Sequence, residues 1–179
     1  MQAYKEKIDT VFDSLKGDFG YKNKMQAPKL EKIVISTGIG KINDAKKIEL
    51  VQDRLAKFTG QKSAPRGAKK SEAAFKVREG DVVGYQITLR GERMQDFFDK
   101  LVHVALPRMR DFRGIKPSAI DEQGNITLGI PEHTIFPETS DEEQKNVFGV
   151  GVTIVTTAKS VEEADAFLRH MGVPLKKAE

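Results

Sequence analysis

Apolar side chains recur along this chain with two periods, one typical of helices and one typical of strands. Steps of three and four residues, which gather apolar side chains on one helix face, predict helices in the segments 2–16, 48–59, 94–106 and 161–171. We expect the second helix to stop at Gly60 and the third to be ended by Pro107. Ser160 and Glu163 form a capping-box pattern at the start of the fourth.

Alternation of apolar and polar residues predicts the strands. They are expected at Leu30–Thr37, Val82–Arg90, Asn125–Gly129, where the pattern is weaker, and Val147–Thr157. In the second of these segments four apolar side chains alternate with Gly84, Gln86, Thr88 and Arg90. One face of that strand is therefore expected in the core and the other in water.

The intermixed helices and strands predict an α+β fold in one domain, residues 1–179. An antiparallel sheet would carry helices on one face, giving a two-layer sandwich, and the polar segment Gln61–Asp81 would add a hairpin with a long basic loop. The open face would present Gln86, Thr88, Arg90, Gly149, Gly151 and Thr153. Such a face suits a nucleic-acid backbone, but it is also what an ordinary solvated sheet presents.

The charge changes sign along the chain, although the net charge is only +4. Residues 1–60 hold 12 basic and 8 acidic side chains, residues 61–116 hold 13 and 7, and residues 117–179 hold 5 and 11. A basic region favours phosphate, and an acidic one favours a basic protein. Ordinary solvated charge is the alternative interpretation.

The residue types give little support to catalysis. Cysteine is absent, which excludes disulfides, thiolate zinc sites and cysteine nucleophiles. His103, His133 and His170 lie in separate segments without metal-ligand spacing, and Ile42 follows Gly38–Lys41 where a phosphate loop needs Ser or Thr. We expect no enzyme activity, no cofactor and no metal. With no signal-peptide pattern and no membrane-spanning run, we expect a cytoplasmic location.

Several runs resemble signature segments of one family, the universal large-subunit ribosomal protein numbered five, in its bacterial form. In chain order they are Lys32–Gly40, Phe58–Gln61, Ala68–Ser71, Phe75–Gly80, Thr88–Gly91, Ala105–Gly114, Ile135–Glu138 and Ile154–Ala158. The eight segments fall in the family's order and span nearly the whole chain. The resemblance implies an α+β ribonucleoprotein component that functions in translation on the cytoplasmic ribosome.

The resemblance also implies partners and contact residues. The family binds 5S ribosomal RNA in the central protuberance, beside other proteins and large-subunit ribosomal RNA. Matching positions are Ser36, Gln61 and Thr88, to which strand alternation adds Arg90. Ser36 stands where asparagine is usual, and its hydroxyl is shorter and offers fewer hydrogen bonds than a carboxamide. A free RNA-binding assembly or regulatory factor is the alternative function.

Two loops are implied to meet other partners. A loop at 69–80, expected to be disordered in the free protein, would contact transfer RNA in the peptidyl site through Lys69, Lys70, Ser71, Phe75, Lys76 and Arg78. Phe75 would stack on a nucleotide or anchor the loop to the core. A small-subunit head protein would meet an intersubunit bridge formed by Glu138, Asp141, Glu142 and Glu143. Thr139 and Ser140 depart from the family's usual residues in that loop.

Overall fold

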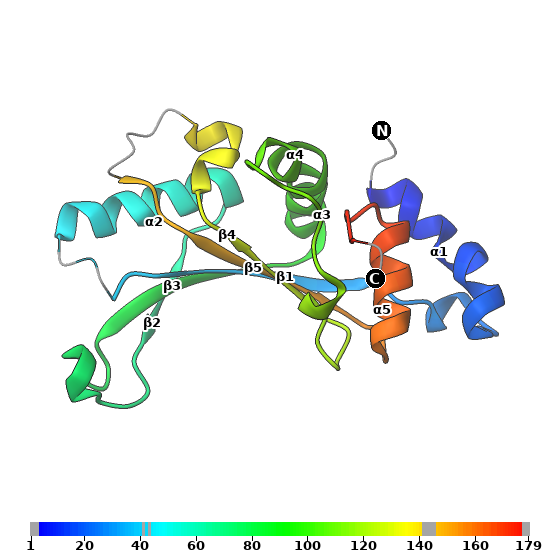
Figure 1. Ribbon diagram of the computed structural model, residues 1–179, viewed down its shortest axis with the longest axis horizontal. Coiled ribbons are helices and arrows are strands. Elements are labelled where there is room, and N and C mark those ends of the chain that lie inside the picture. The colour runs from blue at the N-terminus through cyan, green and yellow to red at the C-terminus, as the bar shows by residue number, and fades with distance from the viewer. Residues whose placement is uncertain (1–3, 41, 43, 141–145, 177–179) are drawn as a thin grey trace. The chain divides into compact units, whose positions relative to one another are not determined.

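The computed structural model describes residues 4–40, 42, 44–140 and 146–176. Its α-helices are α1 Tyr4–Phe19, α2 Ala45–Thr59, α3 Gly91–Lys100, α4 Leu106–Arg108 and α5 Val161–His170 (Figure 1). Its strands are β1 Leu30–Gly38, β2 Ala64–Gly67, β3 Val82–Leu89, β4 Ile126–Ile130 and β5 Val150–Thr156. All four predicted helices and all four predicted strands are present, and the predicted α+β class is confirmed.

The strands form one sheet in the order β2-β3-β1-β5-β4. β2 and β3 pair antiparallel. Between β1 and β5, the Thr157 N–H donates to the Lys29 carbonyl at 3.0 Å, and the Thr37 hydroxyl donates to the Gly149 carbonyl at 2.8 Å. Residue numbers rise on one strand as they fall on the other, so this pair is antiparallel too.

Burial alternates along the central strands. In β1, Ile33, Ile35 and Thr37 are buried while Ser36 is exposed. β4 and β5 repeat the alternation over their whole lengths. Because successive side chains of a strand point to opposite faces, the sheet has one apolar face and one open face, as the sequence predicts.

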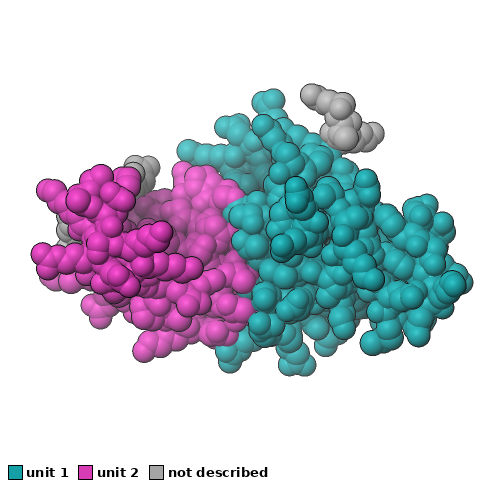
Figure 2. All heavy atoms as spheres, turned by 90° about the horizontal axis from the view of Figure 1, so that it is seen from below, with its two compact units in different colours: residues 1–33, 90–128, 153–179 teal, residues 34–89, 129–152 magenta. Residues whose placement is uncertain are grey.

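The chain divides into two compact units, shown in Figure 2. Unit 1 comprises residues 1–33, 90–128 and 153–179, and unit 2 comprises residues 34–89 and 129–152. In unit 2, Phe58 of α2 stacks on Phe136 with ring centroids 4.4 Å apart. In unit 1, α1 packs against α3 and α5. Since β1, β4 and β5 contribute residues to both units, a single domain over 1–179 stays a prediction.

The start of α5 forms half of the predicted capping box. The Ser160 hydroxyl accepts a hydrogen bond from the Glu163 N–H at 3.2 Å, as expected. The Glu163 carboxylate, however, accepts from the Lys159 N–H at 2.7 Å and from the buried Tyr21 hydroxyl. Burial and this carboxylate raise the pKa of Tyr21, so its hydroxyl stays a hydrogen-bond donor.

Pro107 does not end the third helix, contrary to the sequence prediction. α3 continues through a π-helical turn, Leu101–Ala105, into α4, and Pro107 lies inside α4. The Leu106 N–H bonds the Leu101 carbonyl, five residues back, which is the wider π pattern. Pro107 has no backbone N–H to donate to the preceding turn, and the chain leaves the helix one residue later, after Arg108.

Candidate nucleic-acid interface

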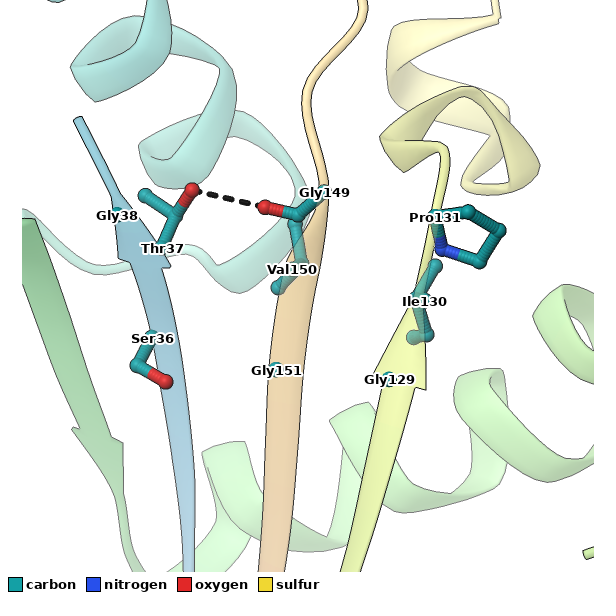
Figure 3. Close-up of a pocket in the computed structure, with 9 residues that line it drawn as sticks. All are labelled: Ser36, Thr37, Gly38, Gly129, Ile130, Pro131, Gly149, Val150 and Gly151. Carbon is teal, nitrogen blue, oxygen red and sulfur yellow. Dashed lines mark hydrogen bonds between the residues drawn. The ribbon is translucent and has the colours of Figure 1, made fainter. Parts of the chain in front are cut away.

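The open face of unit 2 contains a hollow of about 550 Å³ where three strands lie side by side (Figure 3). Its lining is Ser36, Thr37, Gly38, Gly129, Ile130, Pro131, Gly149, Val150 and Gly151. Four of these nine residues are glycines, so backbone rather than bulky side chains meets the solvent. A ligand with a wide, flat surface can therefore approach the strands closely.

Ser36 is held among these glycines without being enclosed. A Cβ atom added at Gly151 would lie 3.2 Å from the Ser36 hydroxyl oxygen, and one added at Gly129 would meet nothing within 4 Å. The neighbouring Thr37 is buried, and its hydroxyl donates to the Gly149 carbonyl (Figure 3). Ser36 therefore presents an exposed hydroxyl on the open face, where the sequence predicted an RNA contact.

Gln61 and Thr88, two further predicted contacts, are brought together by the fold. Gln61 follows the left-handed Gly60 that ends α2, and its Nε2 donates to the Thr88 carbonyl at 3.3 Å. Both residues are half-buried. This bond fixes the Gln61 side chain against β3, and its amide oxygen accepts no hydrogen bond from any described residue. It thus offers a positioned acceptor of the kind that reads a base edge or a ribose hydroxyl.

The edge of the sheet adds cations that the sequence reading did not single out. Arg66 on β2 donates from Nε to the Gln86 side-chain oxygen on β3, and Lys62 lies just before β2. Both cations are exposed. Arg66 was not singled out because β2 has only four residues, too few to be recognised as a strand by an apolar pattern.

The segment at 69–80, expected as a loop, forms the tip of the β2-β3 hairpin. The Ala68 N–H donates to the Asp81 carbonyl at 2.8 Å, and the Gly80 N–H donates to the Ala68 carbonyl at 3.0 Å. Further out, the Ser71 hydroxyl accepts from the Glu79 N–H at 2.9 Å. Residues 73–75 form a single 3₁₀ turn at the end. These local bonds are polar and exposed, so a pattern of apolar residues could not predict them.

Phe75 stands out from this tip, with 78% of its surface exposed. The structure therefore does not support the alternative that Phe75 anchors the loop to the core. The predicted transfer RNA contacts Lys69, Lys70, Ser71, Phe75, Lys76 and Arg78 are all exposed residues of the same hairpin tip. Phe75 also lines a hollow of about 420 Å³ with Gly40, Glu72, Val77 and Val83.

Arg90 lies in unit 1, immediately after β3, where it is the residue before α3. One of its guanidinium nitrogens lies 3.7 Å from a Glu31 carboxylate oxygen, and 60% of its side chain is exposed. An exposed pair at this distance is weak, so the guanidinium remains able to bind phosphate. In the same unit the hydroxyls of Thr127 and Thr153 lie 3.0 Å apart on exposed strand positions.

The predicted small-subunit contact is only partly described. Glu138 is exposed on a short 3₁₀ turn, Pro137–Thr139, whereas Asp141, Glu142 and Glu143 lie outside the described residues. Thr139 is buried, and its hydroxyl donates to the His133 carbonyl at 2.9 Å. Thr139 replaces the family's usual aliphatic residue at a buried position. The replacement therefore adds a hydrogen bond beneath the turn and does not alter the turn's exposed surface.

His133 and His170 have structural roles. His133 is buried, stacks on Phe148 at 4.0 Å, and accepts from the Phe148 N–H. His170 joins α5 to α1 through the Thr10 hydroxyl at 3.0 Å. Within the described ranges no three His, Asp or Glu side chains are grouped to hold a metal ion. No helix in those ranges is long and apolar enough to span a membrane.

Comparison with known proteins gives the class and then the family. Residues 23–78 match the family model described as ribosomal protein L5, and residues 82–175 match the model of the C-terminal part of the same ribosomal family. The chain is therefore a ribosomal protein by class. It belongs to the ribosomal protein L5 family, and the predicted family is confirmed.

The curated relatives are similar over nearly their whole length. A large ribosomal subunit protein uL5 of Desulfosudis oleivorans is 49% identical over 178 residues, covering 98% of this chain and 99% of the relative. The uL5 proteins of Anaeromyxobacter sp. and Flavobacterium johnsoniae are each 48% identical over 168 residues, covering 93% of this chain and 93% and 92% of the relatives. A family of structural ribosomal proteins is not enzymatic, which confirms that prediction.

Proposed function

We propose that this chain binds 5S ribosomal RNA through the open face of its sheet and helps to attach it in the central protuberance. The observation that carries the proposal is the glycine-lined hollow beside Ser36. Backbone and small polar groups are exposed there, so RNA can approach closely and bond through its phosphates and 2′-hydroxyls. The Gln61–Thr88 pair and Arg66 supply a fixed polar group and a cation in the same unit.

The family supports the coarser part of this function. Members of the ribosomal protein L5 family are constituents of the large ribosomal subunit, so this chain acts in translation on the cytoplasmic ribosome. Ribosomal RNA and other ribosomal components are its partners. Membership also favours a ribosomal constituent over the alternative of a free assembly or regulatory factor.

The same proposal includes transfer RNA in the peptidyl site as the partner of the hairpin tip. Lys69, Lys70, Lys76 and Arg78 supply charge for a phosphate backbone, and Phe75 supplies an exposed aromatic face. Aromatic stacking on a base contributes about 1 to 3 kcal/mol. Cations placed around one exposed ring are a common arrangement for an RNA contact that has little sequence preference.

A salt titration of 5S ribosomal RNA binding tests the proposed interface. Arg90→Ala is expected to weaken binding and to reduce the slope of log affinity against log salt by about 0.7 to 0.9, the effect of one lost phosphate contact. Thr88→Val removes a hydroxyl but no charge, so the affinity should fall while the slope stays the same. Unchanged affinity and slope in both folded variants would show that RNA does not bind this face.

The acidic loop is proposed to form the bridge to a basic head protein of the small subunit. Residues 131–145 hold five acidic side chains and one lysine, which RNA phosphates would repel. Changing Asp141, Glu142 and Glu143 together to Lys should slow subunit joining, most strongly at low salt, and spare 5S RNA binding. Normal joining kinetics at low ionic strength would exclude this loop from the bridge.

A further inference from the structure

Residues 108–116, which we call the basic segment, begin at the last residue of α4 in unit 1 and carry four positive charges against one negative charge. Arg108, Arg110, Arg113 and Lys116 are all exposed, and Asp111 is the one acidic residue of the segment. Among the described residues, none of these four cations forms an ion pair or a side-chain hydrogen bond. The open sheet face and the hairpin tip do not include them.

The backbone of the basic segment has a defined and unusual shape. Asp111 has a φ of 54°, a left-handed conformation that few residues other than glycine adopt, and Gly114 has a φ of 91°. The Ile115 N–H donates to the Pro174 carbonyl, and the Lys176 N–H donates to the Ile115 carbonyl, both at 2.8 Å. The segment is thus bonded to residues near the C-terminus rather than left as a free loop.

Arg169 of α5 in turn fixes these C-terminal residues. Its Nε donates to Asp165 at 2.7 Å, and its two terminal nitrogens donate to the Leu175 carbonyl at 3.2 Å and the Lys176 carbonyl at 2.7 Å. The hydrogen bond that Arg169 donates to Asp165 raises the pKa of Arg169. We call Arg169 and residues 174–176 the C-terminal latch.

We propose that the basic segment is a second RNA-binding surface, which takes the phosphate backbone of large-subunit ribosomal RNA, and that the C-terminal latch holds it in its binding shape. Three of its four cations are arginines, whose planar forks bind phosphate through two parallel hydrogen bonds. A surface fixed before binding loses less conformational entropy when it binds. The inference rests on the proposed function, because two RNA surfaces would let one protein attach 5S ribosomal RNA to the subunit.

The test is binding of the full chain to large-subunit ribosomal RNA and, in a separate titration, to 5S ribosomal RNA, each over a range of salt concentrations. The triple variant Arg108→Gln, Arg110→Gln and Arg113→Gln should reduce the salt slope for large-subunit RNA by about 2 to 3. Its affinity for 5S ribosomal RNA should change little. Lys5→Gln, Lys22→Gln and Lys24→Gln together form the matched control, because they remove the same charge from exposed positions in the same unit.

Equal losses in the triple variant and the control would overturn the surface, since net charge alone would then explain the effect. Loss of 5S binding by the triple variant to the same extent as large-subunit binding would also overturn it. Failure of the proposed function has a different signature: the unaltered protein would not bind 5S ribosomal RNA while its binding to large-subunit RNA still depended on the basic segment.

Arg169→Lys tests the latch without changing the net charge. Lysine cannot donate to Asp165 and to two carbonyls in the fixed geometry of the guanidinium. We expect affinity for large-subunit ribosomal RNA to fall on the order of fivefold, with an unchanged salt slope, because all the phosphate-binding cations remain. Amide exchange should become faster at Ile115 and Lys176. Unchanged affinity together with faster exchange would overturn the role of the latch.

If amide exchange is unchanged in Arg169→Lys, the latch is tested with Gly114→Ala instead. The added Cβ atom would lie 3.1 Å from the Pro174 carbonyl oxygen and so disturb the same contact. Unchanged affinity in that variant would overturn the role as well.

Discussion

Removal of residues 72–79 is expected to reduce retention of transfer RNA in the peptidyl site about tenfold or more, while 5S ribosomal RNA binding stays within about twofold. The deletion takes away Phe75, Lys76 and Arg78, that is, the exposed ring and two of the cations around it. It joins Ser71 to Gly80. Ala68, Gly80 and Asp81 all remain in the deletion variant. The hydrogen bonds of Ala68 with Gly80 and Asp81 are therefore kept, and the β2-β3 ladder can still form.

Phe75→Ala and Phe75→Tyr divide this effect into stacking and charge. Alanine removes the ring but keeps every cation, so retention should fall with no change in salt dependence. Tyrosine keeps an aromatic face and should restore most of the retention. The measurement is dissociation of transfer RNA from ribosomes assembled with each variant. Equal loss of transfer RNA and 5S RNA binding after the deletion would show that the hairpin tip and the sheet face are one interface.

The sheet was the part of the fold most open to prediction from sequence. Apolar residues alternate loosely in Leu30–Gly38 and clearly in Val82–Leu89, because one face of each strand is buried and burial restricts about every second residue. The same alternation predicted the open face that includes Thr88, whereas Ser36 was identified only through the resemblance to the family. Charge predicted the basic character of the hairpin, but not the turn at its tip, whose bonds are local and polar.

The contacts that position the candidate sites could not be predicted in this way. Gln61 meets Thr88 across 27 residues, and Tyr21 meets Glu163 across 142, and no periodicity in the sequence links such positions. The C-terminal latch is a further case, because Ile115 is bonded through backbone atoms that are the same in every residue type. At Pro107, by contrast, a definite prediction from the sequence was wrong. A strong local rule predicted that the helix ends at the proline, but the chain continues through a π turn just before it and leaves the helix only after Arg108.

Two glycines of the sheet have different roles: Gly84 allows close packing of two strands, and Gly129 leaves space on the open face. Substitution of Gly84 is expected to have the second large effect, a loss of stability. Gly84 is buried in β3, and a Cβ atom there would lie 2.7 Å from the Thr37 carbonyl oxygen. That oxygen belongs to the backbone of the neighbouring strand, so it cannot move without disturbing β1. Gly84→Ala is expected to lower the free energy of unfolding by about 2 to 4 kcal/mol, measured by urea denaturation. A loss below about 0.5 kcal/mol would mean that β1 and β3 are not packed this closely.

Gly129→Val, in contrast, should leave the stability of the protein nearly unchanged and weaken RNA binding. It therefore tests the RNA contact without disturbing the fold. An added Cβ meets nothing within 4 Å, and valine is favoured in strands, so the free energy of unfolding should change by less than about 0.5 kcal/mol. Its branched side chain would nevertheless stand in the hollow beside Ser36 and keep an RNA backbone away from the strands. We expect 5S ribosomal RNA affinity to fall on the order of tenfold, because several contacts of about 1 kcal/mol are lost together. Tight 5S binding by a stable Gly129→Val protein would exclude the hollow as the RNA site, since no rearrangement of a single serine could make room for both.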